Sequence, residues 1–130
     1  MGKAIGFGGV FIHFNGESKE IFEWYEKYLG MKFSAYGSGF LSGNQLMILT
    51  FKRDDNPLMP FINLRVDDIE SIISIMKKDK IEIISDITDY EYGKFATFKD
   101  IFGNVVELWE ADEEEYIKMV EKEIENYKIH

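Results

Sequence analysis

Residues 92–110 read YGKFATFKDIFGNVVELWE, a pattern typical of a β-hairpin. β-Branched and aromatic residues crowd positions 94–99 and 105–110, which we expect to be strands, and the segment 100–104 between them contains Asp, Gly and Asn. One acid, Glu107, interrupts the apolar second strand. Strand alternation places Glu107 on the same face as Val105 and Trp109. Because an unpaired carboxylate is costly to bury, we expect this face to border water or a polar cavity.

The composition restricts the class of protein. A chain of 130 residues with 45% apolar residues is long enough for one domain with its own core. The net charge of -9, without a basic stripe, argues against nucleic acid and anionic membranes as partners. The absence of cysteine excludes disulfides, thiol catalysis and zinc–thiolate sites. With no transmembrane run and no signal-peptide pattern, we expect a cytoplasmic protein.

Around the hairpin, the chain repeats one order of elements. A strand at 8–14 precedes a helix that Ser18 caps and that ends at Leu29, followed by strands at 31–36, 40–41 and 45–51. After a linker at 52–60 come a strand at 61–66, a helix capped by Asp67 or Asp68, and strands at 82–85, 94–99 and 105–110, with 86–93 as an exposed loop. Such self-similarity indicates two modules of strand, helix and three strands.

A last helix is predicted after the hairpin. Asp112 is its expected cap. Its apolar stripe consists of Tyr116, Val120, Ile124 and Tyr127. We expect the stripe to pack on its own domain; the alternatives are a second subunit or the mouth of a cavity.

Two motifs carry a family resemblance. Trp24-Tyr25 with Leu29-Gly30, and the segment Phe98 to Trp109, resemble motifs of the vicinal oxygen chelate superfamily, which includes glyoxalases, bleomycin resistance proteins and extradiol dioxygenases. The resemblance covers about residues 7–110, although Ile101-Phe102 replaces a proline and an acid. It implies an α+β domain, 1–130, in which two paired βαβββ modules (about 7–51 and 60–110) form a curved mixed sheet around a cavity, with a C-terminal helix at about 112–128. It also implies a homodimer.

The resemblance places the family's metal ligands at Gly9, Ile48, Phe61 and Glu107. Only Glu107 can bind a cation, whereas divalent metals need three or four protein ligands. We therefore expect no metal and no cofactor. The alternative is a divalent metal at Glu107, with His13 as a second ligand and further ligands from a second subunit.

The face of Glu107 defines the expected ligand site. Catalytic candidates are Glu107 and His13, and the remaining candidates are ligand-binding residues: Phe11, Thr50, Phe61, Asn63, Arg65 and Trp109. Arg65 is expected either to neutralise Glu107 or to bind a carboxylate of the ligand. Phe40, Tyr90 and Tyr92 are further aromatic candidates, while Ile62, Leu64 and Val66 should face the helices.

Three functions remain open on the sequence alone. The preferred one is binding of a small molecule without a catalytic metal, because an acidic, aromatic pocket suits the flat, cationic drugs that bleomycin-resistance proteins sequester. The second is a metal-dependent lyase or isomerase of glyoxalase type. The third is a metal-free enzyme in which His13 or Glu107 moves a proton beside a carbonyl.

Overall fold

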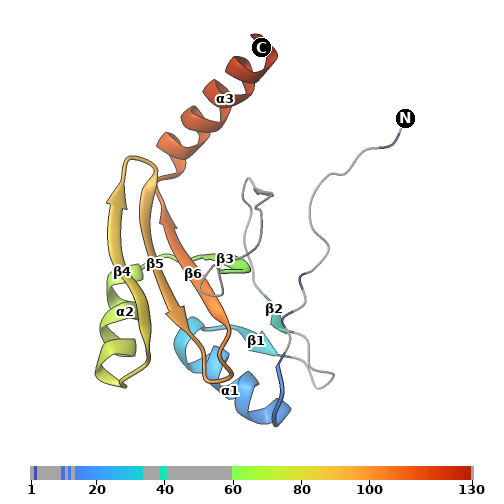
Figure 1. Cartoon of the computed structure of the whole chain (residues 1–130), viewed down its shortest axis with the longest axis vertical. Coiled ribbons are helices and arrows are strands. Elements are labelled where there is room, and N and C mark those ends of the chain that lie inside the picture. The colour runs from blue at the N-terminus through green and yellow to red at the C-terminus, as the bar shows by residue number, and fades with distance from the viewer. Residues whose placement is uncertain are drawn as a thin grey trace.

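The computed structural model describes residues 2, 10, 12, 14–33, 39–40 and 60–129 (Figure 1). Within these ranges lie three helices and six strands. In chain order they are α1 (Ser18–Leu29), β1 (Lys32–Phe33), β2 (Gly39–Phe40), β3 (Ile62–Arg65), α2 (Ile69–Lys78), β4 (Ile83–Tyr90), β5 (Gly93–Lys99), β6 (Val105–Ala111) and α3 (Glu113–Ile129).

The main sheet is mixed and has the strand order β3-β6-β5-β4. β3 pairs with β6 in parallel, whereas β4 with β5 and β5 with β6 are antiparallel. β1 and β2 form a separate antiparallel pair. The run β3-α2-β4-β5-β6 has the βαβββ order expected of the second module. The predicted α+β class is therefore confirmed.

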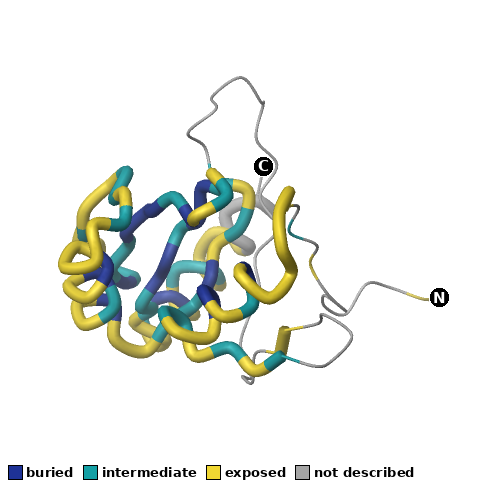
Figure 2. The backbone as a smooth tube through the Cα atoms, turned by 90° about the horizontal axis from the view of Figure 1, so that it is seen from below, coloured by how far each residue is buried: buried dark blue, intermediate teal, exposed yellow. Residues whose placement is uncertain are grey.

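One hydrophobic core lies between the sheet and the two helices α1 and α2. It contains Ile21, Trp24 and Tyr25 from α1, Ile69, Ile73 and Met76 from α2, and Leu64, Ala96, Phe98, Val106 and Leu108 from the strands. Buried positions run through the strands and the inner sides of these helices, and the outer turns are exposed (Figure 2). Leu64 lies in this core and Ile62 and Val66 pack against it, as strand alternation predicted.

The predicted hairpin is confirmed, with strands β5 and β6. Its turn is built around the buried Asp100, whose Oδ1 accepts hydrogen bonds from the backbone N–H groups of Phe102 and Asn104, each at 2.9 Å. Oδ2 of Asp100 accepts one from Nδ2 of Asn104 at 2.8 Å and one from the Tyr25 hydroxyl at 2.9 Å. The two motifs of the family resemblance thus touch each other in the folded chain.

Two local predictions were wrong. Residues 86–90, expected in a loop, continue β4 as far as Tyr90, because this edge strand pairs with β5 through two register shifts. The N-cap of α1 is Glu17, whose side chain makes no capping hydrogen bond, and Ser18 is already helical. Asp68, one of the two residues proposed, does cap α2, since its side chain accepts a hydrogen bond from the Ser71 N–H at 3.1 Å.

The first predicted strand, at 8–14, and the strand at 45–51 lie largely or wholly outside the described residues. α3 begins where predicted: Asp112 Oδ1 accepts a hydrogen bond from the Glu115 N–H at 3.1 Å. The helix then extends beyond the end of the sheet (Figure 1). Among the described helices, none has the length and apolar character to cross a bilayer.

Candidate functional site

The sheet face opposite the helices carries the candidate site. Cross-strand pairing sets Asn63 of β3 and Thr97 of β5 on either side of Glu107 in β6. This arrangement follows from alternation, because the neighbouring Val106 and Leu108 are fully buried in the core. Asn63 donates a hydrogen bond from Nδ2 to Glu107 Oε1 at 2.8 Å. That bond orients the carboxylate and, within the described ranges, leaves Oε2 without a hydrogen-bond partner.

Beside Glu107 lies an open hollow of about 240 Å³. Strands β4, β5 and β6 and the β4–β5 turn form its wall. The lining residues are Ser85, Thr88, Tyr90, Tyr92, Phe95, Ala96, Thr97 and Glu107. Among the described residues, one carboxylate, three aromatic rings and the hydroxyl groups of Ser85, Thr88 and Thr97 therefore surround one space.

The aromatic wall of the hollow rests on Trp109. Phe95 stacks on the Trp109 ring, with centroids 5.3 Å apart and planes 10° apart. The ring centroids of Tyr92 and Phe95 are 5.8 Å apart. The backbone carbonyl oxygen of Tyr92 accepts a hydrogen bond from Trp109 Nε1 at 3.1 Å. Gly93 has φ 137°, and a Cβ there would overlap the Trp109 ring and the backbone of β6, so glycine is required for this approach.

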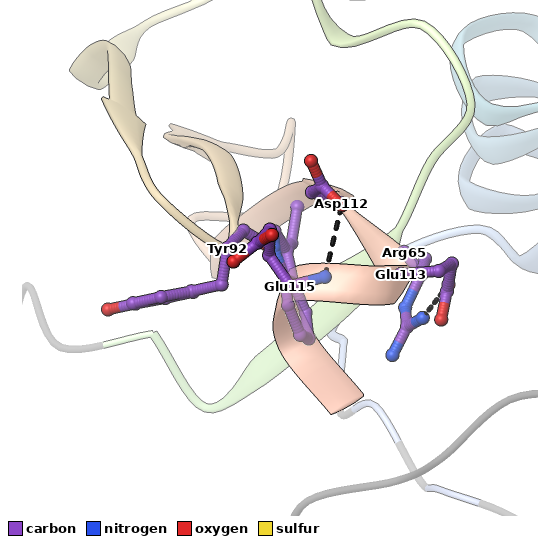
Figure 3. A network of polar contacts seen from close by, with 6 residues as sticks. Arg65, Tyr92, Asp112, Glu113 and Glu115 are labelled. Carbon is purple, nitrogen blue, oxygen red and sulfur yellow. Dashed lines mark hydrogen bonds and ion pairs between the residues drawn. The ribbon is translucent and has the colours of Figure 1, made fainter. Parts of the chain in front are cut away.

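Arg65 of β3 pairs with Trp109 on the side opposite Phe95. Arg65 lies beside Glu113 at the start of α3 (Figure 3). Its guanidinium carbon is 4.5 Å from the Trp109 ring centroid and 5.4 Å from that of Tyr116. Its Nη1 also forms an ion pair with Glu113, the first residue of α3. Burial raises the pKa of the Tyr116 hydroxyl. Arg65 thus joins β3, β6 and α3.

The structure describes only some of the other candidate residues from the sequence. Phe61 precedes β3 and is exposed. Phe11, His13 and Thr50, together with Gly9 and Ile48, lie outside the described residues. Trp109 supports the hollow without lining it. The roles of these residues toward a ligand stay predictions.

On the β4–β5 side of the hollow, sequence reasoning named Tyr90 and Tyr92 as aromatic candidates but missed the other lining residues. Phe95 and Thr97 line it because they pair across the hairpin with Trp109 and Glu107. These two positions could have been predicted from the sequence. A turn over 100–104 sets Lys99 opposite Val105, and this register fixes every other residue pair between β5 and β6. The positions of Ser85 and Thr88 could not be predicted in this way, because the register between β4 and β5 shifts twice.

The described residues of the site do not offer the donor set that a divalent metal needs. In the described part of the chain, no cluster of three His, Cys, Asp or Glu side chains has the proximity needed to hold an ion. Among the described residues that line the hollow, Glu107 is the single carboxylate, and it already accepts a hydrogen bond from Asn63. What this arrangement can do is attract a cation over aromatic faces and accept a hydrogen bond from it.

Two known structures are similar to this chain at low sequence identity. TnmS3, an antibiotic binding protein from Streptomyces sp. CB03234, is 16% identical with a TM-score of 0.57, covering 85% of this chain and 100% of that chain. TioX from Micromonospora sp. ML1 is 11% identical with a TM-score of 0.46, covering 72% of this chain and 89% of that chain. No curated protein sequence matches the chain.

A family model supplies the assignment. The model of the Glyoxalase/Bleomycin resistance protein/Dioxygenase superfamily matches residues 11–108, which include α1, α2 and the greater part of the hairpin. The chain therefore belongs to the glyoxalase/bleomycin resistance protein/dioxygenase superfamily.

Proposed function

We propose that this protein binds a small, flat, cationic molecule in the hollow beside Glu107, without a catalytic metal. The observation that carries the proposal is the meeting of one carboxylate with the rings of Tyr90, Tyr92 and Phe95 around a single open space. Aromatic faces attract a planar cation through their quadrupoles, and a carboxylate neutralises its charge.

The detailed geometry suits binding. Asn63 donates a hydrogen bond to one carboxylate oxygen of Glu107, so the carboxylate is oriented before a ligand binds. The Tyr90 and Tyr92 rings are nearly parallel, 8° apart with centroids 5.9 Å apart, and they stand edge-on to Phe95. A hollow of about 240 Å³ accommodates one ring system rather than a whole large ligand.

The structural comparison is compatible with this proposal. TnmS3, which shares the fold, is an antibiotic binding protein. Because a shared fold does not determine function, the weight of the proposal rests on the hollow itself.

Isothermal titration calorimetry with ethidium, a planar cation, tests the proposal. We expect wild-type protein to bind ethidium, and neutral phenanthridine, its parent ring system, to bind more weakly. Glu107→Gln keeps the shape and the Asn63 contact but removes the charge, so the affinity for ethidium should fall roughly tenfold. Glu23→Gln, on the exposed side of α1, is the matched control and should bind like wild type. Equal affinities in Glu107→Gln and wild type would contradict the proposal.

Metal retention separates the proposal from a glyoxalase-type lyase or isomerase. The protein is dialysed against nickel, zinc, iron or manganese and analysed by inductively coupled plasma mass spectrometry. We expect no metal near one equivalent. Stoichiometric metal that disappears in Glu107→Gln would favour the metal-dependent enzyme. Turnover of a bound carbonyl compound without metal would instead favour proton transfer by Glu107 or His13.

We also retain three proposals about the whole protein: one domain over 1–130, a homodimer and a cytoplasmic location. Family resemblance supports the first two, and the cysteine-free composition supports the third. Limited proteolysis, light scattering and cell fractionation test them in turn.

A further inference from the structure

A row of polar side chains crosses the four-stranded sheet on the side of the hollow. Asn63 of β3 pairs with Glu107 of β6, and Glu107 pairs with Thr97 of β5. Thr97 in turn pairs with Ser85 of β4. Residues that pair directly across strands point to the same face of a sheet, so these side chains, one from each strand, form a polar row. Ser85, Thr97 and Glu107 line the hollow, and Asn63 donates its hydrogen bond to Glu107.

The aromatic side chains that line the hollow all come from one side of the polar row. Phe95 precedes Thr97 in β5 and therefore lies nearer the β4–β5 turn. Tyr90 ends β4, and Tyr92 directly precedes β5. A flat ring that packs on these aromatic faces therefore presents one of its edges to the polar row.

Thr97 is the most buried member of the polar row, with 8% of the residue exposed. Its hydroxyl forms no hydrogen bond with another described residue. Since every buried side-chain nitrogen and oxygen in the described part of the chain has a partner, the Thr97 oxygen must itself be accessible from the hollow. A ligand that fills the hollow removes this oxygen, and Oε2 of Glu107, from water. Each oxygen then costs free energy unless the ligand forms a hydrogen bond with it.

We propose that the hollow selects a planar cation that carries N–H groups along one edge, such as a protonated aminoheterocycle, and that Thr97 determines this selection. The inference rests on the proposed function and narrows its ligand class. One N–H group donates a charge-assisted hydrogen bond to Oε2 of Glu107, and a second donates to the Thr97 hydroxyl. Neighbouring strands are about 4.8 Å apart. Two groups in meta positions of an aromatic ring have nearly this separation. A cation without N–H groups leaves both oxygens unpaired and binds more weakly.

Isothermal titration calorimetry with two flat cations tests the inference on the wild-type protein. Proflavine, a diaminoacridinium ion, carries a ring N–H between two amino groups along one edge. N-methylacridinium has the same ring system and the same charge but no N–H group. We expect the wild type to bind proflavine about tenfold more tightly at neutral pH. Equal affinities would overturn the inference and leave the proposed function standing, whereas failure of both cations to bind would overturn both.

Variants of Thr97 test whether its hydroxyl causes the preference. Thr97→Val replaces the hydroxyl by a methyl group in a side chain that also favours strands, so the affinity for proflavine should fall about fivefold. The affinity for N-methylacridinium should not fall, because that cation has no group that pairs with the hydroxyl. Thr97→Ser keeps the hydroxyl and should retain the preference for proflavine. Urea titration verifies that both variants are folded. An equal loss for the two cations in Thr97→Val would show that Thr97 acts through shape alone and would overturn the inference.

Discussion

At the scale of single residues, Asp100 organises more of the structure than any other polar side chain described. It is 5% exposed, and its two oxygens accept four hydrogen bonds, from Tyr25, Phe102 and twice from Asn104. A buried carboxylate is tolerated when its acceptor sites are satisfied in this way. The turn could be predicted from Asp, Gly and Asn, but the contact with Tyr25, 75 residues away, could not.

The Tyr25–Asp100 contact predicts a pH dependence of stability. Burial, and then the charge of Asp100, raises the pKa of Tyr25. Above about pH 10 the unfolded chain releases this proton while the folded chain keeps it, so the free energy of unfolding falls by up to about 1.4 kcal/mol per pH unit. Below that pH the contribution is fully present. Tyr25→Phe should show a shallower decline than wild type in urea denaturation above about pH 10.

The same experiment contains its own control at lower pH. Near neutrality, Tyr25→Phe should be less stable by about 1–2 kcal/mol, because Asp100 loses one donor and keeps the other hydrogen bonds. Parallel pH profiles for Tyr25→Phe and wild type would show that Tyr25 does not retain its proton.

At the scale of elements, the full length of β4 is not predicted by its sequence pattern. Its exposed half contains Asp86 and Asp89, which favour loops, yet Asp89 pairs with Lys94 of β5. An edge strand is half solvated, so polar residues are accepted once the neighbouring strand supplies the backbone hydrogen bonds. Helices α1 and α2 were easier to predict, since their apolar residues recur at helical spacing on the buried side.

The end of α2 supports a stability prediction. Lys80 follows the helix with φ 60°, a left-handed conformation that side chains other than glycine rarely adopt. Lys80→Gly should raise the free energy of unfolding by about 0.5–1 kcal/mol, because the relieved strain exceeds the added entropy of the unfolded chain. Ser74→Gly, in the middle of α2 with an exposed side chain, should lower it by about 0.5 kcal/mol in the same denaturant titration. If both variants changed the free energy of unfolding in the same direction, this account would be contradicted.

At the scale of the whole molecule, one core holds together parts from both halves of the sequence. The Trp24 ring of α1 stacks on the Phe98 ring of β5, with centroids 5.6 Å apart. The Tyr28 hydroxyl of α1 donates a hydrogen bond at 2.8 Å to Oδ2 of Asp79, the residue that follows α2. These contacts place α1 beside α2 on one face of the sheet and leave the other face for the hollow.

The attachment of α3 to this body depends on Arg65. The Arg65 side chain is 14% exposed and lies against Trp109, whereas the Glu113 side chain is 55% exposed. Arg65→Lys loses the planar stacking and should lower the free energy of unfolding by about 1–2 kcal/mol. Glu113→Gln should lower it by under about 1 kcal/mol, because solvent screens the pair. Urea titration followed by tryptophan fluorescence measures both; a larger loss in Glu113→Gln would show that charge, not stacking, dominates.

The sequence by itself determined the family, the hairpin, the two helices that flank the core and the position of Glu107 on a non-core face. These features rest on spacing between neighbours in the chain, namely alternation in strands, helical periodicity and turn residues. Tertiary structure alone decided that Asn63 binds Glu107, that Arg65 stacks on Trp109, and that Ser85 and Thr88 line the hollow. Such contacts depend on strand order and register across long separations, where several partners satisfy the same local pattern and only packing selects one.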